Sequence, residues 1–160
     1  MAQPLGIKIK WDESAGPAAN AGSELPRLVS AYFSTVREFL AGDPTPPELH
    51  QLRLASKRLR YTLELFRPCY GPGLARRIEK LQTLQQRLGE ISDCATTEAL
   101  LSKRADLRRA EQARLIRHLK ELAAKRVFYF EREWQAEFTG PRMERWWMDY
   151  LARYAGAPRR

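Results

Sequence analysis

Leu49-His-Gln-Leu-Arg-Leu-Ala-Ser-Lys-Arg-Leu-Arg-Tyr61 decides the fold, because its basic and its apolar residues both recur at helical spacing. Glu64 follows one turn later on the same helix, where it can pair with a cation three or four residues away. The basic stripe is about three turns long, and His50 lies at its N-terminal end. On a helical wheel that turns about 100° per residue, its members are Arg53, Lys57, Arg60 and Arg67.

Apolar residues border the basic stripe on both sides, with one group around Leu59 and another around Tyr61. A solvated face on an ordinary surface helix would be one broad polar arc instead. Like charges one turn apart repel by about a few tenths of a kcal/mol per pair. A fold tolerates this cost more readily when an anion occupies the stripe. The pattern therefore predicts a packed helix that binds an anion.

Cap and break signals divide the rest of the chain into further helices. Thr45 is an expected N-cap, with Pro46 in the first turn and Glu48 completing a capping box. Gly89 is expected to close one helix, and Ser92 or Asp93 to cap the next. The expected helices span residues 23–41, 46–68, 74–88, 92–101 and 106–138, with a last amphipathic segment at 143–154.

These helices predict an all-α fold, an antiparallel four-helix bundle with an additional C-terminal helix, because no convincing strand ladder is present. Residues 1–22 are rich in Gly, Ala and Pro and are expected to form a flexible N-terminal arm, with a short β-like piece at 7–11. Residues 23–139 form the expected helical bundle, and residues 140–160 the expected C-terminal amphipathic segment.

Composition excludes several classes of protein. The chain has 160 residues, 44% of them hydrophobic, and a net charge of +9 with a pI near 9.9. No apolar run approaches the roughly 18 residues of a membrane span, and no signal peptide or Gly-rich phosphate loop is expected. Two cysteines and two histidines are too few for a dense disulfide framework or a His/Cys metal site. We expect a cytoplasmic protein with no metal, no cofactor, no catalytic residue and a polyanionic partner.

Basic residues continue beyond the helix that carries the stripe. In the next helix Arg76, Lys80 and Arg87 share one face. Residues 45–90 contain nine Lys/Arg and four Glu, a local charge of +5. Periodic phosphates would find point charges and bidentate guanidinium groups there. A pair of merely solvated faces is the alternative, because most runs of charge are no more than that.

The sequence resembles the CHAD domain, the conserved histidine α-helical domain. One part of the resemblance is a helix of the form H-x-x-R-x-x-x-[KR]-R-x-R, here His50 to Arg60. The other is a helix ending L-G-x-x-x-D, here Leu88 to Asp93. The two blocks together are specific, whereas either alone is weak. The resemblance covers roughly residues 25–130 and is strongest over 48–101.

The resemblance implies an all-helical module that binds inorganic polyphosphate on a basic surface without catalysis. Carried over residue by residue, it implies polyphosphate contacts at His50, Arg53, Lys57, Arg58, Arg60, Lys80 and Arg87. Family members usually carry two four-helix halves related by a pseudo-two-fold axis. This chain resembles one half, the second, so a homodimer would rebuild the symmetric surface. The acidic strand of the triphosphatase domain that often accompanies the family is absent from the sequence.

Three interpretations of His50 stay open: an anion ligand, a phosphoacceptor, or a structural residue at the helix start. Phosphotransfer domains place Gly after the basic residue that follows the histidine, and Leu54 stands there instead. Asp93 is expected to be a helix cap, and His118 a solvated residue of a charged helix.

Two other functions compete with polyphosphate binding. A nucleic-acid binder needs aromatic side chains interleaved with its cations. Only Tyr61 is near the basic stripe and it lies off it, so only non-specific binding through charge is expected. An enzyme or phosphorelay protein acting through His50 needs an acid–base pair or an accessible partner surface. The sequence shows neither.

Overall fold

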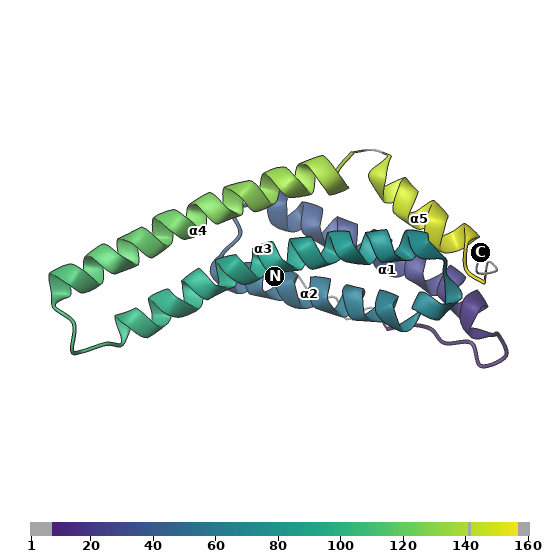
Figure 1. Cartoon of the computed structure of the whole chain (residues 1–160), viewed down its shortest axis with the longest axis horizontal. Coiled ribbons are helices and arrows are strands. Elements are labelled where there is room, and N and C mark those ends of the chain that lie inside the picture. The colour runs from purple at the N-terminus through teal and green to yellow at the C-terminus, as the bar shows by residue number, and fades with distance from the viewer. Residues whose placement is uncertain (1–7, 141, 157–160) are drawn as a thin grey trace.

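The computed structural model describes residues 8–140 and 142–156, and within them the chain forms helices and no strand (Figure 1). This confirms the predicted all-α fold with a C-terminal helix. None of the described helices is both long enough and apolar enough to cross a membrane. The elements are α1 (Pro17–Ala41), α2 (Pro46–Leu65), the 3-10 turn η1 (Arg67–Cys69), α3 (Pro72–Ser102), α4 (Arg109–Phe138) and α5 (Met143–Arg153).

The helices pack around one core. Helix α3 lies between α2 and α4, while α1 packs against α2 and α5. Aromatic rings join three helices at the centre, because Phe33 of α1 lies 5.6 Å from Trp134 of α4 and 6.2 Å from Trp147 of α5 between ring centroids. The far ends of α3 and α4 extend beyond α1 and α2 as a hairpin (Figure 1, left). No residue from 95 to 129 is buried, so this hairpin lies outside the core.

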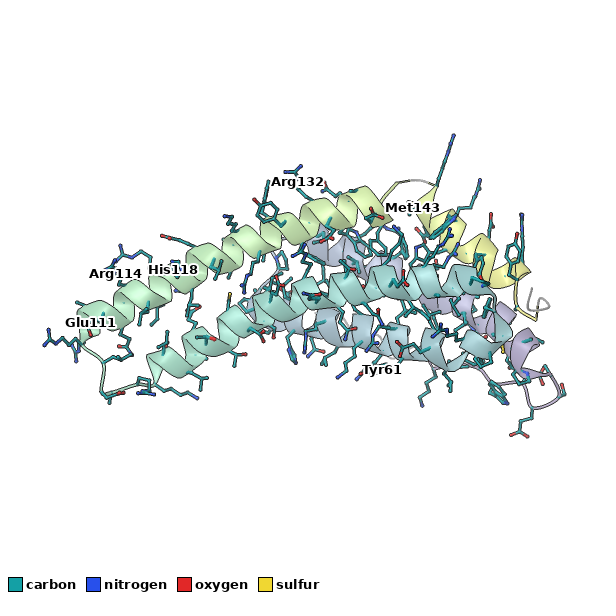
Figure 2. All side chains as sticks on the ribbon, viewed as in Figure 1. Tyr61, Glu111, Arg114, His118, Arg132 and Met143 are labelled. Atoms are coloured by element: carbon teal, nitrogen blue, oxygen red, sulfur yellow. The ribbon has the colours of Figure 1, made fainter. Side chains whose placement is uncertain are left out.

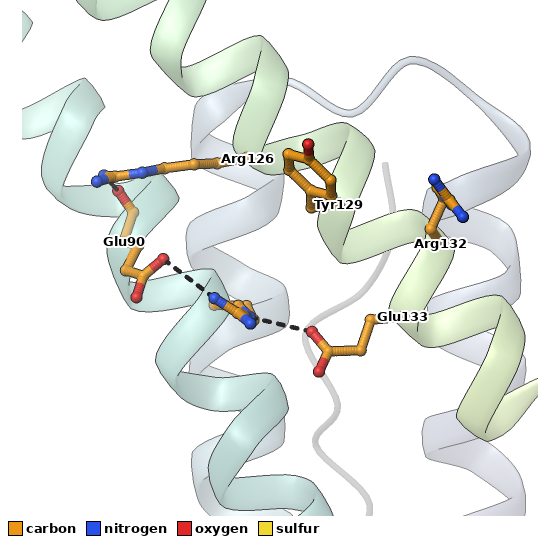
Figure 3. A pocket seen from close by; sticks show the side chains of 6 residues that line it. Glu90, Arg126, Tyr129, Arg132 and Glu133 are labelled. Atoms are coloured by element: carbon orange, nitrogen blue, oxygen red, sulfur yellow. Dashed lines mark hydrogen bonds and ion pairs between the residues drawn. The ribbon is translucent and has the colours of Figure 1, made fainter.

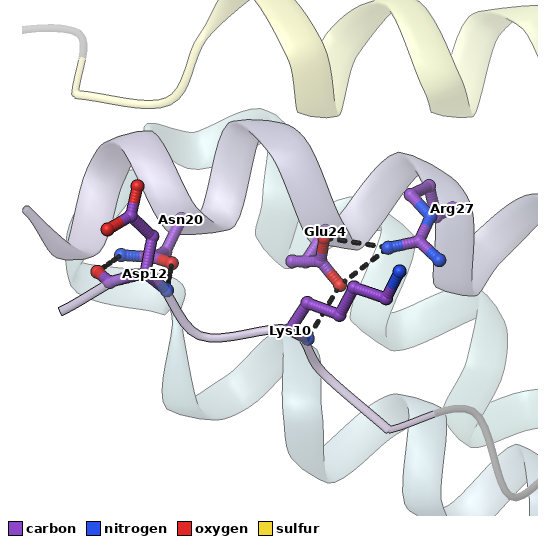
Figure 4. Close-up of polar contacts among 5 residues, drawn as sticks. All are labelled: Lys10, Asp12, Asn20, Glu24 and Arg27. Atoms are coloured by element: carbon purple, nitrogen blue, oxygen red, sulfur yellow. Dashed lines mark hydrogen bonds and ion pairs between the residues drawn. The ribbon is translucent and has the colours of Figure 1, made fainter. Parts of the chain in front are cut away.

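Helix α1 begins six residues earlier than the predicted start at Ser23. Gly16 precedes it and Pro17 occupies its first turn, where a missing N–H costs nothing. The Asn20 side chain anchors the preceding segment, because its Nδ2 donates to Asp12 O at 3.0 Å and its Oδ1 accepts from Asp12 N at 2.8 Å (Figure 4). The Glu24 carboxylate accepts from the Lys10 backbone N–H at 2.9 Å. Residues 17–22 of the expected arm are therefore helical.

The described segment before α1 is tied to the bundle. Trp11 stacks on Phe66 with ring centroids 6.3 Å apart, although half of its surface is exposed. Residues 8–11 form no strand, and the first seven residues of the expected arm lie outside the described residues. At the other end, helix α5 lies inside the expected amphipathic segment, of which residues 141 and 157–160 lie outside the described residues.

The predicted break at Gly89 is wrong, because α3 is one continuous helix from Pro72 to Ser102. The expected separate helix over 92–101 is its last third, so neither Ser92 nor Asp93 caps a helix start. A glycine inside a helix costs about 0.5–1 kcal/mol relative to alanine. Buried Leu88 and Ile91 continue the apolar face across this position, and their packing outweighs that cost. The glycine has a different role, described below.

The predicted start of α2 is correct. Glu48 accepts hydrogen bonds from the backbone N–H and the hydroxyl of Thr45, both at 2.7 Å. These two bonds lower the pKa of the Glu48 carboxyl group. The helix ends at Leu65, and η1 follows it to Cys69, close to the expected end at Pro68. The capping signal therefore fixes where the basic stripe begins.

Helix α5 docks through Arg77, a residue that the sequence patterns did not single out. Arg77 is only 2% exposed, and its guanidinium lies 3.4 Å from the Trp146 ring centroid and 3.9 Å from that of Tyr150. It donates to the backbone oxygens of Gly73 and Trp146. Burial lowers the pKa of Arg77 to about 10. A methyl group on Gly73 would lie 2.5 Å from Tyr150 Cε2, so only glycine fits there.

Candidate polyanion-binding surface

The basic stripe lies on α2, along the edge that meets α3. His50 is exposed in the first turns of α2, and Arg53, Lys57 and Arg60 are half-buried. Within the described ranges, no ion pair involves Arg53 or Lys57. The surface therefore carries cations whose charge is not balanced by a neighbouring carboxylate.

Arg53 lies against Gly89 of α3. A methyl group on Gly89 would be 3.6 Å from Arg53 Nε and 3.9 Å from its Nη2, which is ordinary contact distance. The Arg53 Nε is buried and has no hydrogen-bond partner in the described part of the chain. A buried donor without a partner costs about 1–3 kcal/mol. Arg53 is therefore held close to α3 by contact with a glycine, while its Nε is left unsatisfied.

Arg60 is fixed in place by both helices. Its Nε donates to Gln85 Oε1 of α3 at 2.8 Å, and its Nη1 donates to Glu64 Oε1 at 2.6 Å. This confirms the expected pairing with Glu64. The exposed Tyr61 ring lies 4.5 Å from the Arg60 guanidinium and 5.6 Å from Lys57 Nζ. Two cations of the basic stripe therefore share one aromatic face.

Arg58 lies on the other flank of α2. It lines a cavity of about 390 Å³ together with Ile9 and with Leu28 of α1. On the helical wheel it is at least about 100° away from Arg53, Lys57 and Arg60. The structure therefore does not bring Arg58 together with the basic stripe.

Lys80 and Arg87 face α4 instead of α2. Lys80 pairs with Glu137, and Arg87 Nε donates to Glu133 Oε2 at 3.1 Å (Figure 3). Arg87 is also 3.8 Å from Glu90. Because Gln85 and Gly89 contact α2, Arg87 projects from the opposite flank of α3. The predicted site residues are thus divided between two grooves, and those beside α4 are paired with carboxylates.

Sequence reasoning missed the α3 residues that position the basic stripe. Gln85 is an uncharged residue in a helix of mixed polarity, and Gly89 looked like a helix end. The spacing of Gly89 from the preceding apolar residues gave no sign of a contact with an arginine on another helix. Both cysteines are free as expected, with Cys94 buried and Cys69 half-buried. No group of three or more metal-ligating side chains occurs among the described residues.

Comparison with known protein families identifies the family of this region. A scan against protein families matches residues 4–102 to the CHAD domain. Neither the curated proteins nor the solved structures give a match. The matched region runs from before α1 to the end of α3, contains the whole basic stripe and spans more than half of the chain. CHAD domains are as a rule binding domains and are linked to polyphosphate binding. With this helical fold and this match, the chain belongs to the CHAD-domain family.

Proposed function

We propose that this protein binds inorganic polyphosphate along the basic stripe, as a non-catalytic targeting or scaffold module of the cytoplasm. The observation that carries the proposal is the Arg53 guanidinium, whose buried Nε has no partner among the described residues. A phosphate oxygen can accept from the terminal nitrogens of the same guanidinium, which form no ion pair within the described ranges and are not among the buried atoms that lack a partner. Such charge-assisted hydrogen bonds are the stronger ones.

The neighbouring residues suit an extended anion. Lys57 and His50 lie one turn to either side of Arg53, so a phosphate chain following α2 would meet a donor at each turn. Arg60 is held by Gln85 and Glu64 and continues the same edge. Arg58, Lys80 and Arg87 contribute less, because Arg58 is on another flank and the other two are paired.

We also infer that two copies pair through exposed aromatic residues. The residues offered for that contact are Trp11, before α1, with Trp146 of α5 and Tyr154, which follows it. Light scattering across a concentration series tests it, and a monomer at all concentrations contradicts it. Polyphosphate binding by a monomer would leave the first proposal intact.

The test of the binding site is a titration of long-chain polyphosphate at about 0.15 M salt, where weak charge pairing is screened. The variant is Arg53→Gln with Lys57→Gln. The matched control is Arg145→Gln with Arg153→Gln, which removes the same charge from exposed positions on α5. We expect the first variant to lose at least tenfold in affinity and the control to lose little. Equal losses would contradict the site.

A further inference from the structure

The α3–α4 hairpin holds a second concentration of positive charge. Residues 103–126 contain nine Lys/Arg and three Asp/Glu, a local charge of +6 in a chain of +9. Two of these cations are paired, Arg104 with Asp106 and Lys120 with Glu98. The segment lies entirely beyond residue 102, where the match to the CHAD domain ends. Its charge is therefore separate from the basic stripe and from the matched family region.

On the outer face of α4 two adjacent exposed aromatic rings follow these cations. Phe128 is 54% exposed and Tyr129 is 52% exposed, and their ring centroids lie 5.8 Å apart. The guanidinium of Arg132 lies 5.8 Å from the Phe128 ring. Figure 2 shows Arg114, His118 and Arg132 projecting from the same outer edge of α4, whereas Tyr61 projects from the opposite edge of the molecule.

This arrangement, which we name the α4 face, is what single-stranded nucleic acid needs. It comprises Arg114, Arg117, Lys125, Phe128, Tyr129 and Arg132, which share an arc of about 120° on the helical wheel. Two carboxylates, Glu111 and Glu121, fall on the same arc, so the face carries a net charge of +2. None of its four cations takes part in an ion pair within the described ranges. The core does not require the two rings, since both are more than half exposed.

Each ring also borders a hollow in the surface. Tyr129 lines one of about 590 Å³ between α3 and α4, together with Arg126 and Arg132 (Figure 3). Phe128 lines another of about 510 Å³ on the other side of α4. The Arg126 guanidinium donates to Glu90 O and to Cys94 Sγ, which are both uncharged acceptors. A base stacked on Tyr129 would therefore have space beside the ring and cations close by. The hollow beside Phe128 offers space, but it is lined by Asp43, Glu98 and Glu131, and its cation Lys120 is paired with Glu98.

We propose that the α4 face binds single-stranded nucleic acid without reading its sequence. Bases stack on Phe128 and Tyr129, and the four cations contact the phosphates. Stacking on an aromatic side chain strengthens binding by roughly five- to a hundredfold per base and tolerates every base. Polyphosphate has no flat group, so it gains nothing from these rings. A second copy of the chain is disfavoured on this face, because two such faces would repel each other.

The test uses the full chain and a labelled oligouridine, followed by fluorescence anisotropy at about 0.15 M salt. Phe128→Ala with Tyr129→Ala should weaken oligouridine binding by more than tenfold and leave polyphosphate binding unchanged. Tyr61→Ala with Tyr154→Ala is the matched control, because it removes two other exposed rings. Circular dichroism should show the same helicity for all variants.

Several outcomes would overturn the proposal. One is unchanged oligouridine binding by the Phe128→Ala and Tyr129→Ala variant, and another is an equal loss in the control. Equal weakening of both ligands by that variant would show a general polyanion surface instead. Photo-crosslinking of a thiouridine oligomer gives a second measurement. The proposal expects crosslinked peptides from residues 125–132 of α4, and crosslinks confined to α2 contradict it. Failure of polyphosphate binding would leave this proposal untouched.

Discussion

The basic stripe on α2 and the α4 face carry similar charge and differ in what surrounds it. Residues 45–90 have a net charge of +5 and residues 103–126 a net charge of +6. Three cations of the stripe, Arg53, Lys57 and Arg60, are half-buried, and Arg60 is held by an amide and a carboxylate. The fourth, Arg67, is exposed and lies in η1 beyond the end of α2. The α4 cations are exposed beside aromatic rings on a helix that extends beyond the core. Similar charge can therefore serve different ligands, because the neighbouring side chains decide the shape of the site.

A second contrast separates two arginines with the same unusual feature. Arg53 and Arg77 both have a buried Nε that lacks a hydrogen-bond partner among the described residues. The terminal nitrogens of Arg77 are used inside the protein, on two backbone oxygens and between two aromatic rings. No such internal bond holds the guanidinium of Arg53 in the described structure. We interpret Arg77 as a structural residue and Arg53 as a binding residue.

The largest effect should come from substituting each of these two arginines by alanine. Arg77→Ala removes the clamp on α5, with its hydrogen bonds to two backbone oxygens and its contacts to two aromatic rings, so we expect a loss of about 2–4 kcal/mol in the free energy of unfolding. Arg53→Ala should cost little stability and lower the polyphosphate affinity. Urea denaturation and titration of both variants measure this. If the Arg77→Ala variant folds and loses as much polyphosphate affinity as Arg53→Ala does, the assignment of Arg77 as structural and Arg53 as binding would be contradicted.

Salt dependence should distinguish the two surfaces next. Each cation that contacts a phosphate contributes about one unit to the slope of log affinity against log salt. Arg53→Gln with Lys57→Gln should reduce the slope for polyphosphate by about two and leave the slope for oligouridine unchanged. Arg114→Gln with Arg117→Gln should do the reverse. If both variants change both slopes equally, the two surfaces act as one.

Gly89 offers a finer test of the stripe. Gly89→Ala places a methyl group at ordinary contact distance from Arg53, so it should retain binding and stabilise α3 by about 0.5–1 kcal/mol. Gly89→Leu must displace the Arg53 guanidinium, and we expect a severalfold loss of polyphosphate affinity. Thermal unfolding and titration measure the two effects. Equal affinity of the alanine and leucine variants would show that the position of Arg53 does not matter.

A smaller effect is expected in the α3–α4 groove. Glu133→Gln with Glu137→Gln removes the carboxylates paired with Arg87 and Lys80. We expect polyphosphate affinity to rise by a few fold. Arg87 and Lys80 contribute little to the local field while carboxylates neutralise them, and they contribute more once those carboxylates are removed. Glu38→Gln with Glu79→Gln is the control, since it changes the net charge equally at exposed positions. A rise of the same size in the control would assign the effect to net charge alone.

The smallest effect concerns the stability of the fold at alkaline pH. Burial raises the pKa of Tyr32 and of Tyr70, so above pH 10 the unfolded chain loses these protons first and stability falls. The pKa of Arg77, lowered to about 10, acts in the opposite direction, because from there upward the unfolded chain binds more protons than the folded one. Tyr32→Phe should therefore flatten the fall in denaturation midpoint between pH 9 and 11. An unchanged pH dependence would contradict this assignment.

Local signals in the sequence were enough for most of the fold. The capping box at Thr45 and the run of apolar residues at helical spacing located α2 and its stripe correctly. The long charged helix was expected at 106–138 and occupies 109–138. These elements could be predicted because each depends on residues close together in the sequence.

Tertiary contacts explain what could not be predicted. Gly89 has the local signature of a helix end, and only the neighbouring α2 shows that it makes room for Arg53. Ser23 is a residue type that caps helix starts, but Asn20 and Glu24 bind the preceding segment, and α1 begins at Pro17. The pairing of Lys80 and Arg87 depends on acidic residues about fifty positions away. A wheel drawn for one helix contains none of these partners.

The docking of α5 has a consequence for the order in which the chain acquires its structure. The Gly156 backbone N–H donates to Cys69 O at 2.7 Å, and a methyl group on Gly156 would lie 3.2 Å from Ala18 Cβ. Segments far apart in the sequence must meet before Phe33 and Arg77 are covered, because both are covered by residues of α5. At a synthesis rate of about 5–20 residues per second, residue 151 follows Arg77 by on the order of five to fifteen seconds. During that interval the nascent bundle exposes aromatic side chains to which chaperones can bind and through which chains can aggregate. The synthesis of α5 therefore determines when the aromatic residues of α1 become buried.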